Sequence, residues 1–416
     1  LATVQILRDQ RATLAARCGQ TVSITHVGAR REIPQHDYAA ARVSRDVMEV
    51  ARDPDVDVLV ELIGGTTVAR DLIKLAIEQG KHVVTANKAL IAEHGNELIH
   101  LAEQAGVQLR FEAAVAGGIP VIKTLREAMA ANEVSEVAGI INGTGNFILT
   151  EMSTKGRSYE DVLAEAQALG YAEADPTFDV DGTDAAHKLV ILASLAFGLP
   201  LDVAAPVKQG IQAITPEDLE FAASMGYRMK HLGIARRQGD RVEMRVHPTL
   251  IPEQKQLANV DGVLNAIMIK GDAVGELVLV GPGAGGAATA SAVCADLADI
   301  ARTPAGNGPA LGVPMAQLTS QTLMPADEIA SEWYVRLTAS DCAGVMSDIT
   351  HVLANHNVSI ESLLQNPPQE GQATVAIVLL THVASASVMT AVMKEITALA
   401  EVQPDFTLLR VEAFDQ

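Results

Sequence analysis

From about residue 22 to residue 150, short β-branched runs alternate with segments whose apolar residues recur at helical spacing. A parallel strand reaches its neighbour through a crossover, usually a helix, so this alternation is typical of a parallel, doubly wound sheet. We therefore expect strands at 21–29, 56–65, 81–88, 107–115 and 135–143. Between them we expect helices at 67–80, 89–106 and 120–134.

The 416 residues exceed what a single core usually holds, so we expect more than one domain. Residues after 143 mix helices with later strands, which indicates an α+β layer. A helix at 289–304 precedes a Gly- and Pro-rich stretch. We expect a first domain at 1–143, to which the helix within 281–304 returns, a second at 144–280, a linker at 305–330 and a third domain at 331–416.

The last 86 residues follow a different order. Strand, helix, strand, strand, helix and strand patterns succeed one another at 331–341, 344–357, 358–367, 372–382, 387–402 and 406–414. This βαββαβ order is the ferredoxin-like arrangement. We expect a complete module here.

The formal charge of -20 and a pI near 4.9 argue against nucleic acid or an anionic membrane as a partner. Cys18, Cys294 and Cys342 stand far apart, which suggests neither a disulfide framework nor a zinc site. No apolar run reaches the roughly 18 residues that would cross a bilayer. We expect a cytoplasmic protein with buried thiols.

The glycine-rich turns raise two possibilities for a phosphate-binding loop. No G-x-G-x-x-G precedes the first helix, whereas "GPGAGG" (281–286) fits the pattern but lacks the second strand and acid that should follow. It is either a fingerprint or a close-packed strand-to-helix turn. We expect that 1–19 is the remainder of the first helix, so that the phosphate-binding turn and the first strand precede Leu1.

Two strand ends point to a ligand. "LIGG" (62–65) and "TANK" (85–88) close successive strands, at the carboxyl edge where open α/β sheets bind ligands. By position alone, Lys88 is either a ligand-facing charge or a solvated strand end.

The segment "YAEADPTFDVDGTDAAHK" (171–188) carries five acids before one lysine. Asp184 and Lys188 stand at i and i+4 of a helix start, and a surface ion pair is the simplest interpretation. A calcium loop of D-x-D-x-D-G type is not present. Several carboxylates around one ammonium would also suit a substrate that carries a positive charge.

The run A-x-x-x-G-Y-x-E-x-D-P-x-x-D-V-x-G-x-D-x-x-x-K, residues 166–188, resembles the signature of the homoserine dehydrogenase family at every fixed position. Four further blocks resemble the same family, namely 85–92, 111–122, 139–152 and 281–297. The segment 331–416 resembles an ACT domain, a small amino-acid-binding unit.

The resemblance implies reversible oxidation of L-homoserine to L-aspartate 4-semialdehyde with NAD or NADP, on the route to threonine, methionine and isoleucine. Lys188 matches the catalytic lysine, and Lys88 matches a second lysine near the nicotinamide and the reacting oxygen. Glu173 and Asp184 match residues that hold the substrate, and Asp179 is close enough in the motif to join them.

The resemblance also implies cofactor and cation sites. Gly64 and Gly285 match backbone that lies against the cofactor, with Lys88 beside it. Arg30, with Arg31, follows the second strand and favours the 2′-phosphate of NADP, although exposed arginines are common there and NAD stays open. A sodium or potassium ion would lie at the positions matching Glu112, Val115, Gly117 and Ile119.

On this resemblance the three domains are a nucleotide-binding domain, a substrate-binding and dimerisation domain, and an ACT regulatory domain. We expect feedback control, with threonine as the effector, and a homo-oligomer, dimer or tetramer. The competing hypothesis is a non-catalytic amino-acid sensor on a degenerate scaffold. The complete set of charged residues in 166–188 speaks against it.

Overall fold

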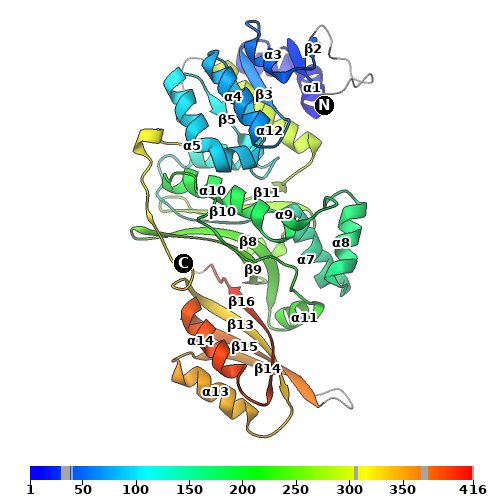
Figure 1. Ribbon diagram of the computed structural model, residues 1–416, viewed down its shortest axis with the longest axis vertical. Coiled ribbons are helices and arrows are strands. Elements are labelled where there is room, and N and C mark those ends of the chain that lie inside the picture. Colours follow the sequence, from blue (N-terminus) through cyan, green and yellow to red (C-terminus); the bar gives the residue numbers. More distant parts are fainter. Residues whose placement is uncertain (30–37, 39–40, 304–307, 367–372, 415–416) are drawn as a thin grey trace.

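The computed structural model describes residues 1–29, 38, 41–303, 308–366 and 373–414. These residues form three tiers along the long axis of the molecule (Figure 1). A parallel sheet flanked by helices lies at one end with the N-terminus, a mixed sheet lies in the middle, and the C-terminal module lies at the other end. The last strand runs back, so the chain ends beside the middle tier (Figure 1).

The first tier is built on a parallel sheet in the order β3-β4-β5, with β3 at Val58–Glu61, β4 at His82–Thr85 and β5 at Leu109–Arg110. Successive side chains of a strand point to opposite faces. Val83 of β4 accordingly packs with helices α4 (Thr67–Glu78) and α5 (Lys88–Ala105). Val84 packs with helices α1 (Ala2–Asp9) and α12 (Gly286–Arg302). Coverage of both faces explains the nearly continuous apolar strands and confirms the expected fold class.

Two further strands of this tier pair apart from the main sheet. Strands β1 (His26–Gly28) and β2 (Arg42–Ser44) form a separate parallel pair, and helix α3 (Val47–Arg52) follows them. A cavity of about 810 Å³ lies between β1 and β3, walled by α1 and α12. The expected first helix is interrupted at Gln10, so that α2 (Arg11–Cys18) follows α1 as a separate helix.

One strand lies in a different sheet from the one expected. Strand β6 (Val134–Ile140) pairs antiparallel with β10 (Leu264–Gly271) and β8 (Tyr227–Gln238) in the middle tier, and not with the parallel strands. The chain leaves the parallel sheet early, because β5 has only two residues before a 3-10 turn, η1 (Glu112–Ala114). The expected helix at 120–134 is short: α6 (Val121–Lys123) continues as a π-turn, η2 (Thr124–Ala128), and leads out of the sheet.

The middle tier is a sheet in the order β11-β10-β6-β8-β9, where β9 is Arg241–Pro252 and β11 is Gly275–Pro282. Its core combines Val137, Ala235 and Val246 of the sheet with Leu189 of helix α10 (Thr183–Phe197), which lies across this face. The remaining helices and turns of the tier are α7 (Gly143–Lys155), α8 (Tyr159–Ala168), α9 (Thr177–Val180), α11 (Pro216–Ser224) and η3 (Gln256–Asn259).

The C-terminal module has the predicted βαββαβ order. Its elements are β13 (Ala330–Ser340), α13 (Val345–Asn355), β14 (Ile360–Gln365), β15 (Thr374–Ser385), α14 (Ala386–Ile396) and β16 (Val402–Val411). The strand order β16-β13-β15-β14 is antiparallel throughout, as the ferredoxin-like arrangement requires. Val335 and Leu379 face α13 and α14, whereas Tyr334 and Leu380 face α11 and α7. The module therefore buries both faces of its sheet.

The middle and C-terminal tiers share backbone hydrogen bonds. Strand β16 pairs parallel with β9 at two positions, Arg410 with Thr249 and Val411 with Leu250, so one eleven-stranded sheet runs through the described part of both tiers. Beside this junction Glu412 binds the guanidinium groups of Arg245 and Arg236. Burial opposes ionisation of Glu412, but the two arginines outweigh it and lower its pKa.

A second polar contact joins the C-terminal module to α11. The Arg336 guanidinium binds the Asp218 carboxylate at 2.6 Å, and the Tyr334 hydroxyl donates to the same carboxylate at 3.2 Å. Asp218 is fully buried. A buried charge needs such partners, so this contact fixes the module against the middle tier.

The expected linker packs against the body of the protein. Within its described residues, 308–330, Ala310 and Leu311 are buried in the main core. A 3-10 turn, η4 (Met315–Gln317), and a short strand, β12 (Thr322–Leu323), follow. β12 pairs with β9, as does β7 (Val207–Lys208). In the described ranges of the chain, none of the helices combines the length and the apolar character needed to cross a membrane.

Candidate functional site

The acidic stretch folds into a loop that delivers two side chains to one point. Pro176 precedes the single turn α9, and Gly182 follows it with φ of 89° at the entrance to α10. A side chain at Gly182 would press on Val246 and His231 of the sheet below, so glycine suits both the angle and the space. Asp184 and Lys188 then lie one turn apart on the first two turns of α10.

The pair is not the surface ion pair that its spacing alone suggests. Asp184 is 3% exposed, and its Oδ2 accepts from Nζ of Lys188 at 2.6 Å. Its Oδ1 lies 2.9 Å from Nζ of Lys88, the first residue of α5, which follows β4. Burial alone would raise the pKa of Asp184, but the two ammonium groups outweigh it and hold the pKa at about 2. The carboxylate therefore stays ionised between two lysines.

Asn142 joins a second carboxylate to this centre. Its Nδ2 donates to Asp184 Oδ2 at 2.8 Å and to Asp179 Oδ1 at 2.9 Å, while its Oδ1 caps α7 by accepting from Gly145 N–H. Burial raises the pKa of Asp179, the bond from Asn142 lowers it, and the charge of Asp184 raises it again. The amide thus separates two like charges that would otherwise repel.

The other acids of the stretch have different places. The Asp175 carboxylate accepts from Thr177 N–H and the Asp181 carboxylate from Thr183, so both shape the loop, as expected. Glu173 is exposed, and its carboxylate accepts no bond from any described residue. Glu173 lies in the same segment as Asp179 and Asp184, but it forms no hydrogen bond with the described residues that bind those two acids.

A network at the strand ends positions Lys88. Buried Glu61, the last residue of β3, accepts from Ile63 N–H and Gly64 N–H through Oε1 and from the Thr85 hydroxyl through Oε2. The backbone N–H of Asn87 donates to the Thr85 hydroxyl oxygen, and the Asn87 side-chain oxygen caps α5 by accepting from Leu90 N–H. Lys88 is therefore the first residue of a helix whose origin is fixed to two strands, and it faces the site.

The residues predicted to touch a cofactor border the same edge. Gly64 has φ of 72° in the turn after β3, and Gly285 has φ of 112° at the start of α12; a Cβ at either position would meet nothing within 4 Å. Gly283, in contrast, packs on Asn265, and its carbonyl closely approaches Gly117. The segment "GPGAGG" is therefore close-packed at Gly283 and open at Gly285. Arg30 lies outside the described residues.

The predicted cation residues form a tight turn after β5. Ala116 and Gly117 both have positive φ, 54° and 36°. The carbonyls of Val115 and Gly117 accept no hydrogen bond from the described residues, whereas the Ile119 carbonyl accepts from Val121 N–H at 2.8 Å. Glu112 is buried and accepts from two backbone N–H groups. The two free carbonyls of this turn are compatible with a monovalent cation. In the described chain, no cluster of three or more His, Cys, Asp or Glu occurs.

Two residues of the site have no role in the sequence analysis. Asn142 belongs to the block 139–152, which carried the family resemblance without any assigned side chain. Phe178 lies in the acidic loop, and its ring centroid is 5.6 Å from Nζ of Lys88. A helix-capping asparagine is detectable from sequence, but nothing in the pattern shows that its other end reaches two carboxylates across the sheet.

The site can donate hydrogen bonds to a bound oxygen. An ammonium group carries three N–H donors. Lys188 uses two of them, on Asp184 and on the Ile141 carbonyl at 2.8 Å, and Lys88 uses one on Asp184. The unused donors belong to two partly buried lysines held by one carboxylate, which suits proton transfer to or from a polar substrate.

Comparisons with known proteins agree over nearly the whole chain. Residues 120–298 match the family model described as homoserine dehydrogenase, residues 2–112 match its NAD-binding domain, and residues 333–401 match the ACT domain. A homoserine dehydrogenase of Pseudomonas aeruginosa is 50% identical over 384 residues, which are 91% of this chain and 88% of the relative.

Solved structures give the same result. A homoserine dehydrogenase from Thiobacillus denitrificans is similar with a TM-score of 0.93 and 45% identity, over 100% of this chain and 96% of that one. A hyperthermophilic archaeal homoserine dehydrogenase in complex with NADPH is similar with a TM-score of 0.56 and 30% identity, over 63% of this chain and 76% of that one.

The Asn142 amide can be tested through the carboxylate that it contacts. In Asn142→Ala, Asp179 loses a hydrogen bond to its charged form, so its pKa should rise further above the ordinary value. Carbon-13 NMR of the aspartate carboxyl groups measures this shift. Ser158→Ala removes the capping side chain of the neighbouring helix α8 and should leave the pKa of Asp179 unchanged. An unshifted Asp179 in Asn142→Ala would contradict the role of the amide.

Proposed function

Because the chain belongs to the homoserine dehydrogenase family, we propose that its site oxidises L-homoserine reversibly to L-aspartate 4-semialdehyde. The observation that carries the proposal is the buried Asp184 carboxylate between Lys188 and Lys88. A sensor without catalytic activity has no use for two lysines fixed on one buried acid. The enzyme is an oxidoreductase.

Lys188 is the proton donor and acceptor in this proposal. In aldehyde reduction its free N–H points at the carbonyl oxygen and the proton moves from Nζ to that oxygen as the alcohol forms. In alcohol oxidation the hydroxyl proton returns to Nζ. Asp184 and the Ile141 carbonyl hold Nζ at its place throughout. Lys88 supplies a second donor to the same oxygen and a positive charge beside it.

The ammonium group of the substrate needs acceptors. Asp179 uses one oxygen on Asn142, and the second oxygen accepts no bond from a described residue. Glu173 on the same loop keeps its whole carboxylate open. We assign these two acids to the ammonium end, and Asp184 to holding the lysines at the hydroxyl end.

A nicotinamide cofactor supplies the hydride chemistry when it is bound. Residues 2–112, which match the NAD-binding domain of the family, would hold it. The open backbone at Gly64 and Gly285, with Lys88 between the strand end and the substrate loop, suits the wall of a nicotinamide pocket. The relative in complex with NADPH supports NADP as the preferred form. The sequence supports it through Arg30, and the preference between NADP and NAD stays a prediction.

The decisive experiment is the rate of homoserine-dependent NADPH or NADH formation, measured with both cofactors. Lys188→Met should lower kcat by roughly 100-fold to 10,000-fold, because a general acid–base contributes that much. Lys208→Met is the matched control, since Lys208 is exposed and, among the described residues, its Nζ donates to the Thr183 hydroxyl near the site. Equal rates for wild type and Lys188→Met would refute the mechanism.

We propose that the turn 115–119 binds sodium or potassium, through the carbonyls of Val115, Gly117 and Ile119 and through Glu112. The free carbonyls of Val115 and Gly117 support this assignment. Potassium chloride should raise the unfolding temperature of the protein, because a ligand that binds only the native state stabilises it. Choline chloride at equal ionic strength should have no such effect. If both salts act alike, the cation site is wrong.

We further propose that the ACT domain mediates feedback control by threonine in a dimer or tetramer. Gly344 supports a binding role, since it starts α13 with φ of 105° and no neighbour within 4 Å of a Cβ. Threonine should inhibit wild type, and Gly344→Ala should weaken the inhibition without changing kcat. Gly275→Ala strains a comparable turn of the middle sheet and should leave inhibition intact. Unaltered inhibition in Gly344→Ala would remove this loop from the effector site.

A further inference from the structure

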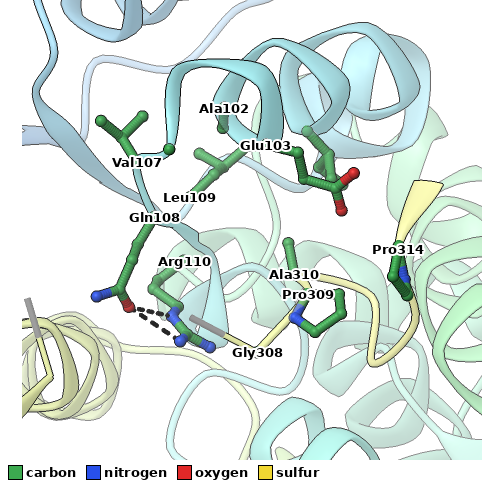
Figure 2. Close-up of a pocket in the computed structure, with 12 residues that line it drawn as sticks. Ala102, Glu103, Val107, Gln108, Leu109, Arg110, Gly308, Pro309, Ala310 and Pro314 are labelled. Carbon is green, nitrogen blue, oxygen red and sulfur yellow. Dashed lines mark hydrogen bonds between the residues drawn. The ribbon is translucent and has the colours of Figure 1, made fainter. Parts of the chain in front are cut away.

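A second cavity lies at the opposite edge of the parallel sheet from the lysines. It has a volume of about 330 Å³ and lies between the carboxyl end of α5, strand β5 and the described linker residues 308–314. Figure 2 shows the guanidinium group of Arg110 on one side of this space and the carboxylate of Glu103 on the other, with Pro309 and Ala310 between them. No part of the proposed reaction uses this cavity.

Arg110 is a buried cation with an unused donor. It is 6% exposed, and its Nε and Nη2 both donate to the Gln108 side-chain oxygen at 3.0 and 2.9 Å (Figure 2). Gln108 is itself fixed, because its Nε2 donates to the Thr303 carbonyl at 2.7 Å. Nη1 of Arg110 forms no hydrogen bond or ion pair with a described residue. A guanidinium held this firmly, with one nitrogen left open, is prepared for an anionic ligand.

The charges around Arg110 do not supply a direct partner. Burial lowers its pKa, and so does the charge of Arg126, whose own Nη1 is buried without a hydrogen-bond partner. Asp296, Asp299 and Glu127 attract Arg110 only through space, since each has its bonds elsewhere. The nearby carboxylates outnumber Arg126, so no surplus of positive charge marks this wall of the cavity. The feature that favours a carboxylate here is the open Nη1 donor of a buried guanidinium.

The opposite wall favours a positive charge. Helix α5 ends at Ala105, so its last carbonyl groups and the negative end of its dipole lie at the cavity. Glu103 adds a carboxylate there, which accepts one N–H, from Met315, at 3.1 to 3.2 Å and keeps lone pairs free. A ligand with two negative charges would be repelled at this end, whereas an ammonium group would be held.

From these two walls we infer that the cavity binds a small zwitterion, a free amino acid with its carboxylate on Arg110 and its ammonium group on Glu103. The apolar middle, with Leu109, Pro309 and Ala310, leaves room for a short side chain. The site is separate from the substrate loop at 171–188 and from the ACT domain. It joins the end of β5 to the linker that leads toward that domain.

The test uses three probes on the full-length protein: glycine, acetate and methylamine. Amide hydrogen exchange, followed by mass spectrometry, reports protection of residues 107–110 and 308–314. Glycine should protect both segments, and acetate or methylamine, each with one of the two charges, should need at least tenfold higher concentration. Arg110→Gln should raise the glycine concentration for half protection more than tenfold, since losing one member of a buried charge pair costs more than about 1.4 kcal/mol.

Glu103→Gln keeps the test decisive if Arg110→Gln does not fold. Glu103 is exposed on α5, and its loss should weaken glycine protection several-fold while leaving acetate protection unchanged. Glu78→Gln, an exposed carboxylate of α4, is the matched control and should bind glycine like wild type. The inference is wrong if acetate protects as well as glycine, if Glu103→Gln equals Glu78→Gln, or if glycine protects only the substrate loop and the ACT domain.

Discussion

The buried carboxylate of Asp184 is the constraint around which the site is arranged. Removing such a charge from water is costly, and it is tolerated only with partners on each side. Those partners come from three separate parts of the chain: Lys188 one helical turn away, Lys88 from the parallel sheet and Asn142 from the start of α7. One ion therefore holds the nucleotide-binding tier and the substrate loop at a fixed separation.

Much of the fold was predictable because local patterns and tertiary packing agree. Strands β3 and β4 and helices α4 and α5 lie where periodicity placed them, since both faces of the sheet are covered and the caps at Asn87 and Gly106 are explicit in the sequence. The C-terminal module was predictable for the same reason. The assignment of β6 to the parallel sheet was wrong because a buried strand is apolar on both faces in either kind of sheet.

The site was predictable only where its residues stand close together in sequence or carry the family pattern. Lys188 and Asp184 are an i, i+4 pair, so their contact follows from helical geometry. The contacts of Lys88 with Asp184, and of Asn142 with Asp179, join residues that are far apart along the chain. The packing of α10 across the middle sheet determines those distances, and the spacing of residues in the sequence does not predict that packing.

The junction of β16 with β9 makes the ACT domain part of the same hydrogen-bonded sheet as the middle tier. A protein shortened before β16 would leave β9 unpaired on one side at Thr249 and Leu250. It would also lose Glu412, one of the two carboxylates that bind the fully buried Arg245, the other being Glu243. The unpaired backbone groups of β9 would favour aggregation, and the loss of one of two carboxylates beside Arg245 would lower the stability of the fold. Insensitivity of such a fragment to an added amino acid would therefore not identify the ACT domain as its binding site, since the same cut also destabilises the middle tier.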